Sequence, residues 1–387
     1  MWDRPARLAQ DLVSVRPARL IIAASETSAD MFYITRFRAP DAFVFLEFRG
    51  RTALLLSDLE LDRGRREARV DEVASYSELE KELQRGKKQK PAFAKVVGEF
   101  LKRRGVKHVV TPRDFPLGLA QSLRGERIRV QAAEGTFWPQ RQFKTPQEVE
   151  ALEEALRIAE AGMARGHEVL RASKAGRDGT LSWRRQTLSA EVLRIEMELA
   201  VVRAGGEARG DTIVACGEMA CDPHERGKGP LSANQLIILD IFPRDSRSGY
   251  FGDLARTVVR GRANEAQRHM WETCLVGQQR VFQALRPGLK GQKIHEETKA
   301  FFAKSGYPTT IKNGRWSGFF HGTGHGLGLE IHEEPRFAAA TFRSGQVFTV
   351  EPGIYWPGVG GVRHEDVVVI SDQGHHLISN FPKQLEL

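Results

Sequence analysis

Residues 321–333 read His321-Gly-Thr-Gly-His325-Gly-Leu-Gly-Leu-Glu-Ile-His332-Glu333, which places three histidines and two glutamates within thirteen residues. Imidazole is the commonest metal ligand in proteins, and glycine lets the backbone pass close to a compact group. The same pattern could also form a glycine-rich turn whose histidines bond only to backbone. Four carboxylates in apolar surroundings elsewhere in the chain favour a metal site instead.

Two apolar segments each carry one aspartate. Residues 236–242 contain Asp240, and residues 249–259 contain Asp253. Residues 243–249 are rich in turn formers, so the sequence predicts a β-hairpin with one buried aspartate in each strand. Two bare carboxylates that face each other in a sheet would repel one another and lose hydration. A bound cation removes both penalties.

Two later strand-like segments each carry a glutamate. Glu351 follows the apolar run 347–350, and Glu365 lies within the run 361–370. One such carboxylate is more often a paired charge than a metal ligand. Four of them together with His325 share no such ordinary explanation, and they therefore predict a metal centre.

The order Asp, Asp, His, Glu, Glu resembles the proline-peptidase branch of the pita-bread metallopeptidases. That branch includes prolidase and Xaa-Pro aminopeptidase, and methionine aminopeptidase is a more distant relative. Residues 321–333 are similar to its histidine signature, and Thr349–Tyr355 and Gly361–Asp366 are similar to its two glutamate motifs. The resemblance is strong over about residues 145–380 and looser before them.

The resemblance implies that five residues hold two divalent metal ions per subunit: Asp240, Asp253, His325, Glu351 and Glu365. Four carboxylates and one imidazole are mostly hard ligands, which suits Mn²⁺, Co²⁺ or Zn²⁺. Two dications would balance four carboxylates, so the cluster could be buried. Two ions that share one water molecule lower its pKa and clamp the attacking and leaving oxygens, which is hydrolytic chemistry.

The resemblance also implies roles beside the metal ligands. Glu351 would shuttle a proton from water to the leaving nitrogen. His224 resembles a substrate-binding histidine, and His332 resembles one that steadies the tetrahedral oxyanion. His321 would support the loop behind the ligands. Arg363 could brace the site, hold a substrate carboxylate or only balance the acidic ligands; strand alternation predicts that it shares a face with Glu365.

The chain departs from the family pattern without losing a ligand. The spacing from Asp240 to Asp253 is longer by two residues, which keeps the strand parity, and Ile241–Pro243 replaces the usual residue and glycine. Ala255 stands where threonine is usual, and His364 stands where an aliphatic residue is common. We expect these changes to alter the substrate entrance and not the metal ligands.

A chain of 387 residues usually forms two domains, and a boundary is predicted near residue 143. Thr145, Pro146 and Glu148 form a helix start with a capping box. We expect an α+β protein in which a smaller α/β domain, residues 1–143, precedes a pita-bread catalytic domain with pseudo-two-fold symmetry, residues 144–387. Strands are predicted at 20–24, 42–48, 52–56, 107–111 and 128–131, and helices at 91–104, 146–172, 189–204, 263–285 and 292–304.

Composition predicts a cytoplasmic protein. The chain has only three cysteines, and a small, odd number argues against a disulfide framework. This indicates a reducing compartment. No segment reaches the ~18 consecutive apolar residues that span a bilayer. Residues 1–7 lack the apolar core of a signal peptide. We therefore expect no membrane partner.

A net charge of +9 can be a sign of nucleic-acid binding. Lysine and arginine are spread along the chain, and the densest run, Arg85–Lys90, is followed by Pro91, as in a solvated linker. No zinc-finger, helix-turn-helix or RNA-platform motif is present in the sequence. We therefore expect no nucleic-acid partner.

Three classes of function compete. The leading one is a dinuclear metallopeptidase that acts on short proline-containing peptides, either as an Xaa-Pro dipeptidase or as an Xaa-Pro aminopeptidase. A metal-free creatinase-like hydrolase and a binding module derived from the same fold are the others, and the complete ligand set disfavours both. The modest chain length favours the dipeptidase. The resemblance further implies a homodimer.

Overall fold

The computed structural model describes residues 17–312 and 314–387. Residues 1–16 lie outside this description, and so does the expectation that residues 1–7 are no signal peptide. The described chain forms two compact units that divide between Pro139 and Gln140. No helix of the described residues is long and apolar enough to cross a bilayer.

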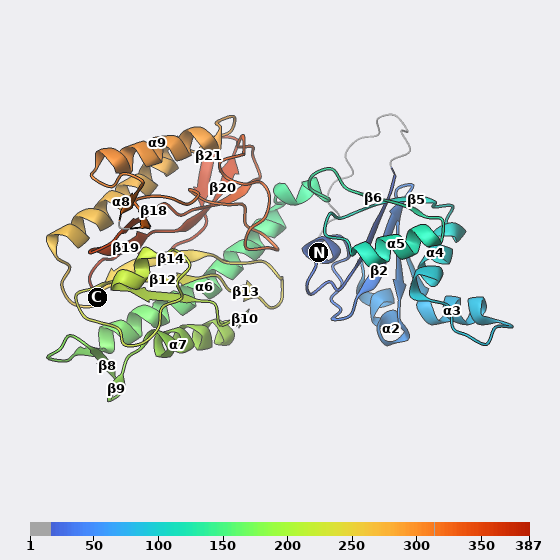
Figure 1. The fold of residues 1–387 in the computed structure, drawn as a ribbon, viewed down its shortest axis with the longest axis horizontal. Coiled ribbons are helices and arrows are strands. Elements are labelled where there is room, and N and C mark those ends of the chain that lie inside the picture. Colours follow the sequence, from blue (N-terminus) through green and yellow to red (C-terminus); the bar gives the residue numbers. More distant parts are fainter. Residues whose placement is uncertain (1–16, 313) are drawn as a thin grey trace. The chain divides into compact units, whose positions relative to one another are not determined.

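The first unit is built on a mixed sheet with helices packed against it (Figure 1). Its described strands are ordered β4 (Glu72–Ser75), β3 (Arg51–Leu56), β2 (Phe43–Phe48), β1 (Ala18–Ala23), β5 (His108–Thr111) and β6 (Arg129–Ala132). The pairs β1–β2 and β2–β3 are antiparallel, and β3–β4, β1–β5 and β5–β6 are parallel. Leu20, Val44, Val97 and Phe100 belong to its core.

The sequence predicted five of these strands to within a few residues, and helix α4 (Phe93–Arg103) as well. It missed β4 and four helices: α1 (Ala29–Thr35), α2 (Asp58–Glu67), α3 (Tyr76–Gln84) and α5 (Leu117–Gly125). Helix α2 buries only Gly64, so it has no apolar stripe to reveal its period.

Helix α6 (Pro146–Ala172) is the longest helix of the described chain and matches its predicted bounds. The Thr145 side chain accepts a hydrogen bond from the Glu148 backbone N–H, and the Glu148 carboxylate accepts one from the Thr145 N–H. This capping box satisfies free donors at the helix end and fixes where the helix begins.

In the second unit, α6 and α7 (Ala190–Arg203) lie on one side of the strands, and α8 (Glu265–Ala284) and α9 (Gly291–Lys304) on the other (Figure 1). The predicted helices are thereby confirmed within two residues at each end. Short 3₁₀ segments η1 (Pro139–Gln142) and η2 (Gly217–Cys221) complete the helical part.

The strands of this unit form small sheets. The three-stranded sheets, each in spatial order, are β11 (Ile213–Cys216), β12 (Leu236–Ile241) and β14 (Leu254–Val259); β17 (Val347–Val350), β20 (Asp366–Ser371) and β21 (Gly374–Leu377); and β7 (Lys174–Ala175), β8 (Leu181–Trp183) and β9 (Gln186–Thr187). The two-stranded sheets pair β18 (Gly353–Trp356) with β19 (Gly360–Arg363), β10 (Gly206–Glu207) with β13 (Arg244–Asp245), and β15 (Thr310–Lys312) with β16 (Arg315–Ser317).

Two predicted strands differ from the structure. Strand β14 pairs antiparallel with β12, as predicted, but starts at Leu254, so Asp253 precedes the strand. The Phe251 N–H instead bonds to the carbonyl oxygen of Gly328, 2.9 Å away. The predicted continuous run 361–370 is two strands, β19 and β20, which pair in different sheets; between them the Glu365 N–H bonds to Ala255 O at 3.0 Å.

Candidate metal centre

The structure brings the five predicted ligands together. His325 Nε2 lies 3.5 Å from Asp253 Oδ2 and 3.4 Å from Glu351 Oε1. Asp253, His325 and Glu365 are buried and offer ligand atoms that all lie within 4.8 Å of one another. Burial raises the pKa of Asp253, Glu351 and Glu365, and the charge of Asp240 raises all three further, so Asp240 interacts with the other three carboxylates.

Three of the carboxylates occupy strand ends. Asp253 directly precedes β14, Glu351 directly follows β17, and Glu365 directly precedes β20; Asp240 alone lies inside a strand, β12. Side chains at strand ends can converge from several sheets, whereas those within one strand alternate between its two faces.

Backbone hydrogen bonds tie the ligand segments to each other. The Glu351 N–H bonds to Thr323 O at 2.9 Å, and the Thr349 N–H bonds to His325 O at 2.9 Å. The Glu365 N–H bonds to the carbonyl oxygen of Ala255, which is the residue opposite Asp240 in the β12–β14 register. The segments that carry the candidate ligands are therefore bonded to one another.

The glycines of the histidine loop allow this close approach. A Cβ at Gly324 would lie 1.9 Å from Thr349 O, and a Cβ at Gly326 would lie 2.5 Å from Glu333 O. Side chains larger than hydrogen would push the loop away from β17 and would carry His325 with it.

The cluster is electrostatically strained without a cation. Burial and the nearby carboxylates raise the pKa of Asp253 and of Glu365 well above the ordinary values, and burial chiefly raises that of Glu351 to about 8. Burial also lowers the pKa of His325 to about 3, which keeps its imidazole neutral. Asp240 Oδ1 is buried and has no hydrogen-bond partner among the described residues. This donor set fits divalent cations.

Arg363 braces Asp240. Its Nη2 donates to Asp240 Oδ2, and its Nη1 donates to the Tyr355 hydroxyl at 2.8 Å and to Pro223 O at 3.2 Å. Both Arg363 and Asp240 are buried. These contacts fit both bracing and charge balance among the three predicted roles of Arg363, because the Arg363 charge also lowers the pKa of Asp253, Glu351 and Glu365.

Tyr355 extends this network to His321, a connection that the sequence analysis missed. The Tyr355 hydroxyl lies 2.8 Å from His321 Nε2, and His321 Nδ1 lies 2.8 Å from the Gly322 carbonyl oxygen. Because a carbonyl only accepts, Nδ1 carries the proton and the Tyr355 hydroxyl donates to Nε2. Tyr355 closes the quoted motif around Glu351, so a signal was present in the sequence.

His224 and His332 lie beside the cluster and are exposed. The His332 ring stands 4.3 Å from the His325 ring, at 88° to it. Partial burial of its ring lowers the pKa of His332, and the positive charge of Arg336 lowers it further. Both imidazoles are thus available to a bound molecule next to the ligands.

The end of the histidine loop is anchored by a buried ion cluster that the sequence analysis did not predict. Lys144 Nζ lies 2.5 Å from Glu333 Oε1, and Arg141 Nη2 lies 2.6 Å from Glu333 Oε2. Burial alone would raise the pKa of Glu333, but Lys144 and Arg141 bring it below its ordinary value. The Glu333 N–H also bonds to Gly326 O at 3.0 Å, which closes the loop that presents His332.

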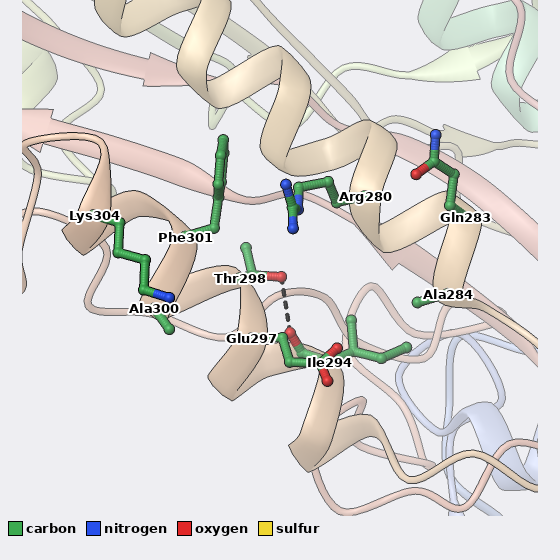
Figure 2. A pocket seen from close by; sticks show the side chains of 9 residues that line it. All are labelled: Arg280, Gln283, Ala284, Ile294, Glu297, Thr298, Ala300, Phe301 and Lys304. Carbon is green, nitrogen blue, oxygen red and sulfur yellow. Dashed lines mark hydrogen bonds between the residues drawn. The ribbon is translucent and has the colours of Figure 1, made fainter.

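A hollow of about 780 Å³ lies elsewhere, between α8 and α9 (Figure 2). Arg280, Phe301 and Lys304 line it together with six other residues, and the guanidinium of Arg280 stands 4.7 Å from the Phe301 ring centre. None of the predicted site residues belongs to it. Most of its lining side chains are exposed, so it is a surface groove and not a closed site.

The sequence profile of metallopeptidase family M24 matches residues 150–372, more than half of the chain. The chain belongs to metallopeptidase family M24. The predicted family resemblance is thereby confirmed. The match covers Asp240, Asp253, His325, Glu351 and Glu365.

This M24 chain is similar in sequence to several named proteins. The Xaa-Pro dipeptidase of Pyrococcus furiosus is 31% identical over 248 residues, which cover 63% of this chain and 64% of that protein. The match thus spans less than two thirds of that relative's length. The putative dipeptidase YkvY of Bacillus subtilis is 28% identical over 93% of each chain.

Solved structures confirm the fold of this M24 chain. The Xaa-Pro dipeptidase from Bacillus anthracis aligns with 96% of this chain and 95% of its own, at a TM-score of 0.79 and 24% identity. The X-Pro aminopeptidase from Thermotoga maritima aligns with 96% and 97%, also at a TM-score of 0.79, with 21% identity. The predicted α+β architecture with a pita-bread catalytic domain is therefore confirmed.

Proposed function

We propose that this chain is a dinuclear metal-dependent Xaa-Pro dipeptidase, which hydrolyses the bond before proline in dipeptides. The observation that carries the proposal is the buried convergence of Asp240, Asp253, His325, Glu351 and Glu365, whose carboxylates repel each other unless cations neutralise them. The preference for proline is supported by the names of the relatives, several of which are Xaa-Pro dipeptidases.

Those five residues would hold two ions of Mn²⁺, Co²⁺ or Zn²⁺, because carboxylates predominate among them. Bound divalent ions supply Lewis-acid activation of a water molecule and of the scissile carbonyl. Arg363 holds Asp240 in place from the side away from its unpaired oxygen. The Arg363–Tyr355–His321 chain supports the start of the histidine loop.

Glu351 is the proton carrier in this proposal. Its carboxylate takes a proton from the attacking water and delivers it to the leaving proline nitrogen. His332 donates a hydrogen bond to the oxyanion that develops on the scissile carbonyl, and His224 contacts the substrate from the loop after η2. Both side chains are exposed beside the ligand cluster, where a peptide can reach them.

An Xaa-Pro aminopeptidase is the alternative, because a structure with that name aligns with this chain at the same TM-score as the dipeptidase. A dipeptidase must exclude a residue after proline, whereas an aminopeptidase must accept one. Leu-Pro and Leu-Pro-Leu therefore separate the two, and Leu-Leu tests the requirement for proline.

We expect protein loaded with Mn²⁺ to cleave Leu-Pro faster than Leu-Pro-Leu and to leave Leu-Leu intact. Chelation should abolish cleavage, and Mn²⁺, Co²⁺ or Zn²⁺ should restore it. Faster cleavage of Leu-Pro-Leu would favour the aminopeptidase. Full activity in metal-free protein would refute the dinuclear site.

The proposal includes a homodimer in the cytoplasm. The three cysteines, Cys216, Cys221 and Cys274, are buried and unpaired, which suits a reducing compartment. Light scattering on the purified protein measures the oligomeric state directly, and a monomeric mass would contradict the dimer.

A further inference from the structure

Gln278 of helix α8 reaches both glutamate ligands through the backbone. It is fully buried, and its side-chain Nε2 donates to Val350 O at 2.9 Å and to His364 O at 3.0 Å. Val350 directly precedes Glu351, and His364 directly precedes Glu365. One amide group therefore joins the two peptide units from which the glutamates project.

This amide sits where two paired strands part. Val350 and Asp366 form the last pair of the antiparallel β17–β20 ladder, so Glu351 and Glu365 occupy the next pair of facing positions. The ladder does not continue there, because the Glu351 N–H bonds to the histidine loop and the Glu365 N–H bonds to β14. Gln278 bridges the strands at the point where their own hydrogen bonds stop.

The contacts of Gln278 indicate that its side chain serves the arrangement of the two strands more than the stability of the fold. Its Nε2 also lies 3.1 Å from Asp366 Oδ2, but its Oε1 is buried and has no partner among the described residues. A buried polar atom without a partner lowers stability, and an apolar side chain of similar size would avoid that penalty. Asp366 has cationic partners of its own in Arg256 and Lys383.

We propose that Gln278 is a positioning residue of the metal centre, which sets the separation of the Glu351 and Glu365 carboxylates. The inference rests on the proposed dinuclear site. Groups that orient metal ligands typically change metal affinity 10–100-fold when they are lost. Gln278 would act in this way through the backbone of the ligand residues.

The test compares Gln278→Met with Gln279→Met. Methionine keeps the length of the side chain and removes both N–H donors, and Gln279 is the exposed neighbour on the same helix. Mn²⁺ is titrated calorimetrically into each metal-stripped full-length protein. We expect wild type and Gln279→Met to bind Mn²⁺ alike, and Gln278→Met to bind at least one Mn²⁺ about 10–100-fold more weakly.

Co²⁺-loaded proteins provide a second readout, since the visible absorption of Co²⁺ depends on ligand geometry. The Gln278→Met spectrum should differ from that of wild type, and the Gln279→Met spectrum should not. If Gln278→Met does not fold, Gln278→Asn replaces it, because its amide is one methylene too short to reach both carbonyls.

A purely structural role makes a different prediction. Metal-free Gln278→Met, or Gln278→Asn, would then melt at a lower temperature while its Mn²⁺ affinity and Co²⁺ spectrum stayed those of wild type, and that result overturns the inference. A wild-type protein that binds no Mn²⁺ would instead refute the proposed function itself.

Discussion

His325 and His332 stand edge to face, with ring centres 4.3 Å apart, yet only His325 points into the carboxylate cluster. His325 is buried between Asp253 and Glu351, whereas His332 is exposed. Two adjacent imidazoles in one loop are thus placed for different tasks.

Replacement of these two histidines should therefore affect metal content differently. His332→Ala should keep its metal ions and lose turnover by roughly 10²–10³-fold, the usual loss for one oxyanion donor. His325→Ala should bind metal weakly. Elemental analysis and kcat of both variants check this, and a His332→Ala protein that loses its metal would contradict the assignment.

Glu351→Gln should remove turnover, because an amide cannot carry the proton. We expect kcat to fall by about 10²–10⁴-fold, the range for loss of an acid–base group. The amide oxygen can still act as a ligand, so some metal should remain bound. Near-normal kcat in a variant with full metal content would exclude Glu351 as proton carrier.

Arg363→Met should destabilise the metal-free protein by about 3–5 kcal/mol, because it leaves Asp240 buried without its cation. Bound metal should restore much of that loss. Lys293→Ala is the control, since it breaks the exposed Lys293–Glu297 pair and should cost no more than about 0.5 kcal/mol. Urea unfolding with and without chelator measures both, and equal effects would contradict the bracing role.

The metal-free protein should lose stability as pH rises from 6.5 to about 8. Burial raises the folded-state pKa of Glu351 to about 8, so the folded state holds a proton there that the unfolded state has released. Histidines with a lowered pKa, such as His325, oppose this mainly below and around their ordinary value of 6.5, where the unfolded imidazoles release their protons. Denaturation of chelated protein at both pH values tests the slope.

Two comparisons sharpen the pH experiment. Glu351→Gln should show a shallower loss, because the titrating carboxyl is gone. Mn²⁺-loaded protein should not lose stability over this range, since metal binding strengthens as its ligands deprotonate. A metal-free wild type that gains stability from pH 6.5 to 8 would contradict the prediction.

Local signals predicted the parts of the fold that local forces determine. The capping box at Thr145 fixed the start of α6, and the two extra residues between Asp240 and Asp253 left β12 and β14 in an antiparallel pair, as predicted. The order of the motifs also predicted which five side chains would lie together, because the resembled family places the matching residues in one cluster.

Long-range contacts account for what could not be predicted. Strand β14 begins late because Phe251 bonds to Gly328, far away in sequence, and the run 361–370 divides between two sheets where Glu365 bonds to Ala255. Gln278 lies in an ordinary amphipathic helix, and nothing in its neighbours reveals the carbonyls that it meets. Such partners appear only once the sheets have assembled.

The ion pairs of Glu333 determine where a fragment that contains the second compact unit can begin. The family match begins at residue 150, but Arg141 and Lys144 precede it. A fragment trimmed to the match would bury Glu333 without either cation and would remove the Thr145 cap of α6. A fragment meant for separate expression should therefore start no later than Gln140, where the compact unit itself begins.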